Sequence, residues 1–208
     1  LATAVTAAQR GHTVELWEQA SEIGGQFNMA KRIPGKGEFY ETLKYFTHHL
    51  KKSGVTVKLN HAATTQSLKE SAADHIVLAT GVHPRPISLP GIEHPNVLNY
   101  VDVLRHDKPI GEKVALIGAG GIAFDVVEFL NHERTHSQHL PELDEYFTTW
   151  GIDHEFTERS GLTKAHPPQA KHQITMMQRS KGKLGARLGK TTGWIHRSQA
   201  KTFGVTML

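Results

Sequence analysis

The residues Gly118-Ala119-Gly120-Gly121-Ile122-Ala123 match the pattern G-x-G-x-x-G/A, with alanine in the last position. An apolar run at residues 114–117 precedes them and an amphipathic stretch at 122–130 follows, which is the strand–turn–helix context that the pattern requires. The first glycine permits a tight turn, the second lets a pyrophosphate approach the backbone, and the small last residue lets the helix pack closely on the strand. The stretch therefore predicts a dinucleotide-binding turn, against the alternative of a tight glycine turn without a ligand.

Strands alternate with helices on both sides of this turn. Apolar periodicity predicts helices at 1–10, 38–52 and 193–200, and strands at 13–18, 55–59, 75–79, 173–178 and 204–207. Because strands separated by helices pair in parallel through right-handed crossovers, these elements predict an α/β fold. We expect two Rossmann-like dinucleotide-binding units, each with three layers around a mostly parallel sheet and each incomplete. The expected units are residues 1–110 and residues 111–208, the latter with an insertion at 131–170.

Glu18 ends the strand at 13–18, where the acid that hydrogen-bonds an adenosine ribose would lie. Such an acid follows its glycine turn by about 20 residues, which places the matching turn before Leu1. The N-terminal half is therefore expected to lack its first strand and glycine turn, and the chain is expected to be a fragment. The alternative interpretation of Glu18 is an ordinary surface glutamate after an edge strand.

A basic loop follows the strand at 173–178, about sixty positions after the glycine turn. This distance fits the expected spacing only when residues 131–170 are an insertion in the crossover. The strand then ends without an acid for a ribose 2′-hydroxyl, and Arg179, Lys181 and Lys183 suit a 2′-phosphate. These residues predict NADP in preference to NAD, and a solvated basic loop is the alternative.

The composition is that of an ordinary globular protein: 208 residues, 38% hydrophobic and 21% charged. No apolar run approaches the ~20 residues of a membrane-spanning helix, and the start shows no signal pattern. The absence of cysteine excludes disulfides and thiolate-bound clusters within the chain and favours a cytoplasmic location. A basic cluster at 179–197 has no nucleic-acid motif beside it. Neither nucleic acid nor membrane is therefore an expected partner.

A few other side chains leave two interpretations open. Asp125 either orients the glycine turn or faces solvent, where a helix N-terminus favours an acid. Trp194 and His196 are candidates for nucleotide contact, and a core position is the alternative for Trp194. Three histidines at helical spacing favour a solvated polar face over a zinc site, because no fourth ligand has a fixed place. They are His132, His136 and His139. We assign no catalytic residue and no metal ligand.

Several segments resemble the C-terminal FAD- and NADPH-binding part of bacterial NADPH-dependent 2,4-dienoyl-CoA reductase. The first is Ser21-Glu22-Ile23-Gly24-Gly25-Gln26-Phe27, which precedes Ile33-Pro34-Gly35-Lys36, and the second is Leu78-Ala79-Thr80-Gly81 with Pro84-Arg85. The most specific is Gly189-Lys190-Thr191-Thr192-Gly193-Trp194-Ile195-His196-Arg197. It separates this family from trimethylamine dehydrogenase and the small subunit of glutamate synthase. The resemblance covers nearly the whole chain.

In that family an N-terminal TIM barrel, which this sequence lacks, holds FMN, a 4Fe-4S cluster and the 2,4-dienoyl-CoA substrate. The resemblance implies an electron-input module, in which hydride passes from NADPH to FAD, of an enzyme of unsaturated fatty acid β-oxidation. It also implies that the closing segment of the FAD domain lies beyond Leu208, so that both units are truncated. The implied cofactor-binding residues are Glu18, Gly25, Gln26, Ala63, Thr80, Gly81, Gly118, Gly120, Gly121, Arg179 and Lys181.

Two alternatives stay open. One is the diaphorase module of a related flavoprotein, of the trimethylamine dehydrogenase or glutamate synthase small-subunit type, which predicts an acid in place of Arg179. The other is a non-catalytic fragment that packs against a partner, because an exposed sheet edge and an open FAD site favour swapping or oligomerisation. The chain by itself is expected to be inactive.

Overall fold

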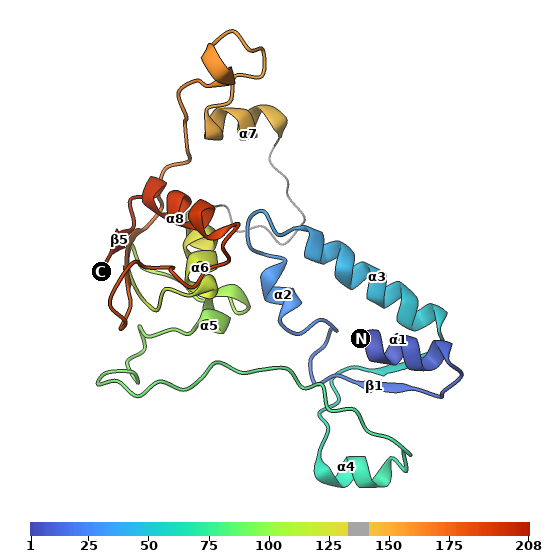
Figure 1. Cartoon of the computed structure of the whole chain (residues 1–208). Helices are drawn as coiled ribbons and strands as arrows, with labels where there is room; N and C mark the ends of the chain where they lie inside the picture. Colours follow the sequence, from blue (N-terminus) through green and yellow to red (C-terminus); the bar gives the residue numbers. More distant parts are fainter. Residues whose placement is uncertain (133–141) are drawn as a thin grey trace. The chain divides into compact units, whose positions relative to one another are not determined.

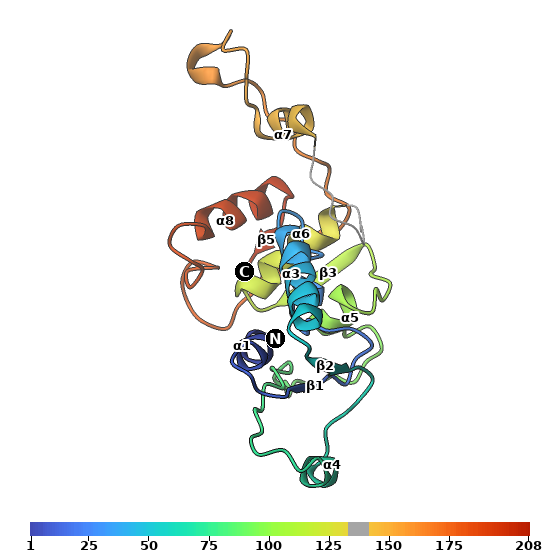
Figure 2. The same ribbon diagram turned by 90° about the vertical axis from the view of Figure 1, so that its right-hand side faces the viewer.

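The computed structural model describes residues 1–132 and 142–208, which form two compact units. The first unit comprises Leu1–Lys31 and Glu38–Pro90, and the second comprises Arg32–Gly37 and Gly91–Leu208. Each unit contains a parallel sheet with helices (Figures 1 and 2). The predicted α/β fold class with parallel sheets is confirmed. No helix among the described residues is long and apolar enough to cross a bilayer.

The sheet of the first unit has two strands, β1 (Glu15–Trp17) and β2 (Thr56–Lys58), which pair in parallel. Two helices, α1 (Ala2–Gln9) and α3 (Glu38–Lys52), pack together beside it (Figure 1). Their shared core contains Val5, Leu50 and Val55. Helix α3 has acids in its first turn and basic residues in its last turn, an order that the helix dipole favours. Helix α3 covers the predicted residues 38–52, so its predicted bounds are confirmed.

Two short helices of the first unit were not predicted: α2 (Phe27–Ala30) and α4 (Thr65–Glu70). Neither is long enough to show a full apolar period. Helix α4 instead depends on a local capping box, in which the Thr64 side chain accepts from Ser67 N–H and the Ser67 side chain accepts from Thr64 N–H.

The predicted strand at 75–79 is wrong. The segment is irregular and has no backbone hydrogen bond to any described residue, and Leu78 is 75% exposed. A strand exists only through the ladder bonds that it makes with a neighbour. The described sheet of this unit consists of β1 and β2, and neither pairs with this segment. The apolar run was therefore an insufficient signal.

The second unit has a three-stranded parallel sheet in the order β3-β4-β5. Its strands are β3 (Lys113–Ile117), β4 (Gln173–Met177) and β5 (Thr206–Met207). Strand β4 is central, which explains why Ile174 and Met176 are buried. The helices α6 (Gly121–Asn131) and α8 (Gly193–Thr202) lie side by side (Figure 2), and α5 (Tyr100–Leu104) packs on α6. This order is the one that the first half of a doubly wound sheet takes.

A short segment from early in the chain belongs to the second unit. The buried Arg32 guanidinium lies 2.6 Å from an Asp107 carboxylate oxygen and donates to the Leu104 carbonyl at 2.6 Å. It also lies over the Phe129 ring of α6, 5.1 Å from the ring centroid. These contacts attach the segment to α5 and α6.

The polar stretch that follows α6 contains α7 (Leu143–Trp150) and a 3₁₀ turn at Arg159–Gly161. Gly151 follows the last residue of α7 and caps the helix in a left-handed conformation. A Cβ there would lie 2.5 Å from the Thr163 carbonyl oxygen, so glycine is required. His136 and His139 lie outside the described residues. His132, at the end of α6, places its Nδ1 2.9 Å from the Glu128 carbonyl.

Candidate functional site

The glycine turn lies between β3 and α6, as predicted. Gly118 has φ +126°, a conformation that favours glycine, and its N–H donates to the Met177 carbonyl of β4 at 2.8 Å. Gly120 is different, because its φ of −87° and ψ of 179° suit any residue. A Cβ at Gly120 or Gly121 would meet nothing within 4 Å. The backbone therefore requires glycine at 118, whereas neither backbone nor packing requires it at 120.

The start of α6 presents unpaired backbone donors. No side chain caps it, no acid lies in its first turn, and the N–H groups of Gly121 and Ile122 have no hydrogen-bond partner in the described part of the chain. The next two amides, of Ala123 and Phe124, both donate to the Gly120 carbonyl, at 3.0 and 3.4 Å. Free amides and the positive end of the helix dipole suit an anion. The turn can therefore hold a phosphate group.

The basic loop follows β4 at the same edge of the sheet, since the carboxyl ends of parallel strands lie together. Arg179 and Lys181 are exposed, and neither forms an ion pair with a described carboxylate. The Gln178 side chain donates to the Gly182 carbonyl at 2.9 Å and closes the loop. The loop thus offers cations without internal partners beside the glycine turn.

Asp125 neither caps the glycine turn nor faces solvent freely. Its two carboxylate oxygens each lie 2.7 Å from Lys36 Nζ, and both side chains are partly buried. One turn later, Glu128 is only 5% exposed. The pKa of the Glu128 carboxyl is raised to about 7, mainly by burial and also by the charge of Asp125, and the charge of Lys36 opposes this rise. The sequence signal that was missed is an acid inside the apolar run Val126-Val127-Glu128-Phe129-Leu130.

In the first unit, Glu18 follows β1 directly. Its Oε1 accepts from the Ala20 N–H at 2.8 Å, and its carbonyl accepts from the His61 N–H at 2.9 Å. The second bond joins the chain after β1 to the chain after β2. Ala63 lies two residues further along and is exposed. The structure therefore brings Glu18 and the segment before Ala63 together at the carboxyl edge of this sheet.

The next predicted position, Gly25, lies in a turn whose geometry depends on its neighbour. Gly24 has φ +122°, and a Cβ there would lie 2.7 Å from Leu43 Cδ2 of α3. Gly25 also has positive φ, +50°, but a Cβ there would meet nothing within 4 Å. Packing against Leu43 therefore requires glycine at position 24, whereas the space beside the Gly25 Cα is empty.

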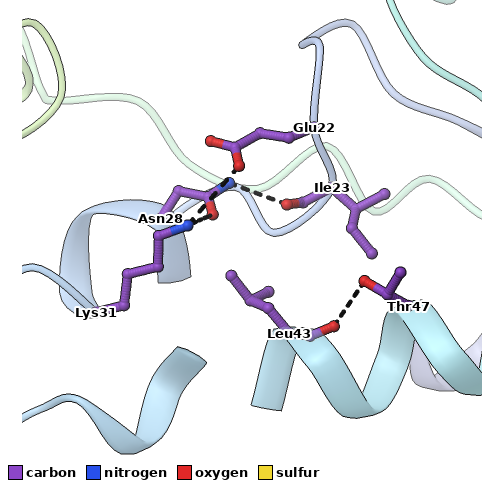
Figure 3. Close-up of polar contacts among 6 residues, drawn as sticks. All are labelled: Glu22, Ile23, Asn28, Lys31, Leu43 and Thr47. Carbon is purple, nitrogen blue, oxygen red and sulfur yellow. Dashed lines mark hydrogen bonds and ion pairs between the residues drawn. The ribbon is translucent and has the colours of Figure 1, made fainter. Parts of the chain in front are cut away.

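A buried asparagine that sequence reasoning missed fastens this turn to α2 (Figure 3). The Asn28 amide donates to the Ile23 carbonyl at 3.0 Å and accepts from Lys31 Nζ at 2.8 Å. Lys31 Nζ also lies 3.7 Å from a Glu22 carboxylate oxygen. The Asn28 side chain thus joins Ile23, which precedes the turn, to Lys31, which follows it. An isolated Asn in a short helix gives no sequence signal for such a role.

Gln26 is bonded to the residue that follows Thr80 and Gly81, the two remaining predicted positions. Its amide donates to the Val82 carbonyl at 3.1 Å, directly after Thr80 and Gly81. Thr80 and Gly81 are exposed, and Gly81 has φ +73°. The structure therefore brings Gln26 to this turn. Among the described residues, no hydrogen bond joins Gln26 to Glu18 or Ala63.

Comparison with known proteins gives a consistent result. Residues 1–160 match the family model "Pyridine nucleotide-disulphide oxidoreductase". Cinnamate reductase of Clostridium sporogenes is 36% identical over 132 residues, which cover 61% of this chain and 19% of that protein. The metal reductase of Desulforamulus reducens is 25% identical over 214 residues, which cover 97% of this chain and 30% of that protein. The NADH oxidase of Thermoanaerobacter brockii is 32% identical over 133 residues, which cover 61% and 20%.

Solved structures share the fold. The complex of 2-naphthoyl-CoA reductase with 2-naphthoyl-CoA superposes with a TM-score of 0.74 at 24% identity, over 99% of this chain and 25% of that chain. Histamine dehydrogenase from Rhizobium sp. 4-9 gives a TM-score of 0.64 at 12% identity, over 98% and 28%. The chain therefore spans 19% to 30% of the length of these curated relatives and solved chains.

Proposed function

Because the chain belongs to the pyridine nucleotide-disulphide oxidoreductase family, we propose that it is the electron-input module of an NADPH-dependent flavoenzyme. In this proposal the second unit binds NADPH and the first unit binds FAD. The family implies both kinds of cofactor, and the choice of NADPH over NADH depends on the residues of this chain. The chemistry supplied by the two cofactors, when bound, is hydride transfer from NADPH to FAD.

Gly120 carries the NADPH half of the proposal. The fold tolerates a larger residue at this position, because its backbone is extended and the space beside its Cα is empty. A glycine that the fold does not require is explained by a ligand that needs the backbone within reach. The unpaired N–H groups of Gly121 and Ile122 supply the donors for such a ligand. The residues of this turn therefore fit a pyrophosphate.

Arg179 and Lys181 carry the preference for the 2′-phosphate. Both follow β4, the strand next to the one that leads into the glycine turn. That is the place from which a dinucleotide-binding unit contacts the adenosine ribose, with an acid for NAD and a cation for NADP. Because neither cation has an internal carboxylate partner among the described residues, both are available to an anion.

For FAD we propose that the first unit binds the adenosine ribose through Glu18 and approaches the rest of the cofactor through its exposed turns. Glu18 lies at the carboxyl edge of the sheet, where ligands of open α/β sheets bind. The bond from Gln26 to Val82 holds two of these turns together. The residues assigned to FAD are Glu18, Gly25, Gln26, Ala63, Thr80 and Gly81.

For the whole enzyme we propose a 2,4-dienoyl-CoA reductase of the cytoplasm, in which a separate barrel would hold FMN, a 4Fe-4S cluster and the thioester substrate. The support is the resemblance of residues 189–197 to that family. A diaphorase module of an amine dehydrogenase is the competing proposal, and it predicts a preference for NADH. Assays of the enzyme that carries this chain, with NADPH or NADH as donor and 2,4-dienoyl-CoA or an amine as second substrate, separate the two.

Calorimetric titration of the chain with NADPH, NADH and FAD tests the cofactor assignments. We expect NADPH to bind at least about tenfold more tightly than NADH, a difference of about 1.4 kcal/mol that one charge-assisted contact supplies. Equal affinities would contradict the 2′-phosphate assignment. Binding of none of the three would leave a module that only packs against a partner.

Two substitutions sharpen this test. Gly120→Ala should leave the free energy of unfolding unchanged within about 0.5 kcal/mol, since its Cβ enters empty space, and should weaken NADPH binding at least about tenfold. Arg179→Gln should weaken NADPH and spare NADH, whereas Arg159→Gln, at an exposed position in the 3₁₀ turn, should change neither. Full NADPH affinity in Gly120→Ala would remove the main support for the proposal.

A further inference from the structure

Trp194 is a large apolar side chain placed at the surface. It lies in the first turn of α8 and is 60% exposed, so the core position considered for it is excluded. Its neighbour in the helix, Ile195, is less exposed, and Gly193 is buried. Leaving a tryptophan in water forgoes the stabilisation that its burial would give. A tryptophan exposed at the start of a helix that is buried at Gly193 and Ala200 is therefore a candidate for contact with a ligand.

The topology places Trp194 at the edge of the sheet that carries the glycine turn. Strand β4 ends at Met177, the chain continues through the basic loop to α8, and α8 returns it to β5, which is parallel to β4. In such a crossover the helix begins at the carboxyl edge of the sheet and ends at the amino edge. The first turn of α8 and the loop with Arg179 therefore belong to one strand–loop–helix connection at this edge.

The start of α8 is held closely by the chain before it. A Cβ at Gly193 would lie 2.7 Å from Leu188 Cβ, so the helix begins in direct contact with the loop. The Gly193 N–H also donates to the Gly189 carbonyl at 2.7 Å. The backbone next to Trp194 is thus held by the packing of Gly193 on Leu188 and by the hydrogen bond from Gly193 to Gly189.

The same loop is fixed against α6. Arg197 of α8 donates to the Gly185 carbonyl at 3.0 Å, and a Cβ at Gly185 would lie 2.9 Å from the Phe124 ring of α6. Gly185 has φ +69°, which also favours glycine. The helix that carries Trp194 is therefore connected to α6, whose start is the proposed phosphate site, through the Arg197 side chain, Gly185 and the Phe124 ring.

We propose that the Trp194 indole stacks on the adenine ring of the bound nucleotide, beside the cations that hold its 2′-phosphate. This inference rests on the proposed binding of NADPH to the second unit. The adenosine end is favoured over the nicotinamide end because residues after the second strand of such a unit contact the adenosine ribose. An indole offers a wide, rigid π face, and a purine base offers another. Trp194 is then a positioning residue for the cofactor.

The experiment uses 2′,5′-ADP, which contains the adenosine and its 2′-phosphate but no nicotinamide. Calorimetry should show about tenfold weaker binding to Trp194→Leu than to the unchanged chain, the loss expected for one base–aromatic stack. Trp194→Phe should retain most of the affinity. Trp150→Leu, at a partly exposed tryptophan of α7, should retain all of it. Equal affinity in Trp194→Leu would overturn the inference.

Indole fluorescence supplies a readout that a merely structural role would not move. The chain has three tryptophans, Trp17, Trp150 and Trp194. Stacking predicts that 2′,5′-ADP quenches the emission of the unchanged chain and of Trp150→Phe, and leaves that of Trp194→Phe unaltered. Quenching that persists in Trp194→Phe overturns the stack but leaves NADPH binding standing. Failure of both NADPH and 2′,5′-ADP to bind the unchanged chain overturns the proposed function and this inference together.

Discussion

Replacing Glu128 by glutamine should stabilise the second unit at neutral and alkaline pH and leave its stability almost unchanged in acid. Glu128 is buried in α6, with Asp125 one turn before it and His132 one turn after it. Lys36 is bonded to Asp125, and His132 Nδ1 lies 3.7 Å from a Glu128 carboxylate oxygen. Glutamine has the shape of the protonated acid and carries no charge, so it removes only the cost of ionisation.

The magnitude follows from the pKa of the Glu128 carboxyl. Burial, together with the charge of Asp125 and against that of Lys36, raises this pKa from an ordinary 4.5 to about 7 in the folded chain. The folded state therefore holds the proton more tightly than the unfolded state, and this stabilisation is fully present below pH 4.5 and lost as the pH rises through about 7. At 1.36 kcal/mol per pKa unit, the loss amounts to roughly 3 kcal/mol. Above that window the unchanged chain should be less stable than Glu128→Gln by roughly this amount.

Urea denaturation followed by circular dichroism, at several values between about pH 4 and pH 8, measures the effect. The difference in unfolding free energy between Glu128→Gln and the unchanged chain should grow over this range and then level off. Glu145→Gln, an exposed glutamate of α7, is the control and should show no such trend. A difference that is constant with pH, or a Glu128→Gln protein that is less stable near pH 8, would refute the reasoning.

Three further substitutions test the packing described above. Gly24→Ala should lower the unfolding free energy of the first unit by about 2–4 kcal/mol, because a Cβ would meet Leu43 in a strained conformation. Gly25→Ala should cost about 1 kcal/mol, for its positive φ alone, and comparable losses in the same urea experiment would contradict the assigned difference. Asn131→Ala should cost about 2 kcal/mol, because the buried Asn131 side chain accepts from the Lys171 N–H. A loss below about 0.5 kcal/mol on thermal or urea unfolding would argue against that bond.

Local signals were sufficient for much of the fold. The bounds of helix α3 could be predicted because its apolar periodicity, its acidic first turn and its basic last turn all depend on residues within the helix. The turn at Gly118 was equally predictable, since the chemistry of a strand–glycine–helix junction depends on neighbours in sequence. The segment at 75–79 was not, because a strand depends on a partner elsewhere in the chain, and no signal within the segment reports whether the partner is present.

The side-chain contacts of the candidate site could not be predicted from the sequence, because they also join residues that are far apart in the chain. Lys36 and Asp125 are separated by 89 positions, and only the folded chain shows that the acid pairs instead of capping the turn. Asn28 holds the Gly24–Gly25 turn through bonds to a carbonyl and a lysine, which no composition or spacing reveals. The sequence did not decide between a core position and a surface position for Trp194, and only its exposure in the structure does so. Side-chain pairing between distant segments is therefore the part that required a structure.

The short segment with Arg32 and Lys36 also sets an order of events during synthesis. These residues leave the ribosome before their partners Asp107 and Asp125, which follow 75 and 89 positions later. At about 5–20 residues per second, translation takes roughly 4–18 s to deliver those partners. Over that interval the arginine and the lysine are hydrated while residues 38–90 are already available to fold. The second unit is thus begun before the first is complete and is itself completed after it. A nascent chain halted near residue 90 would carry two cations whose partners do not yet exist.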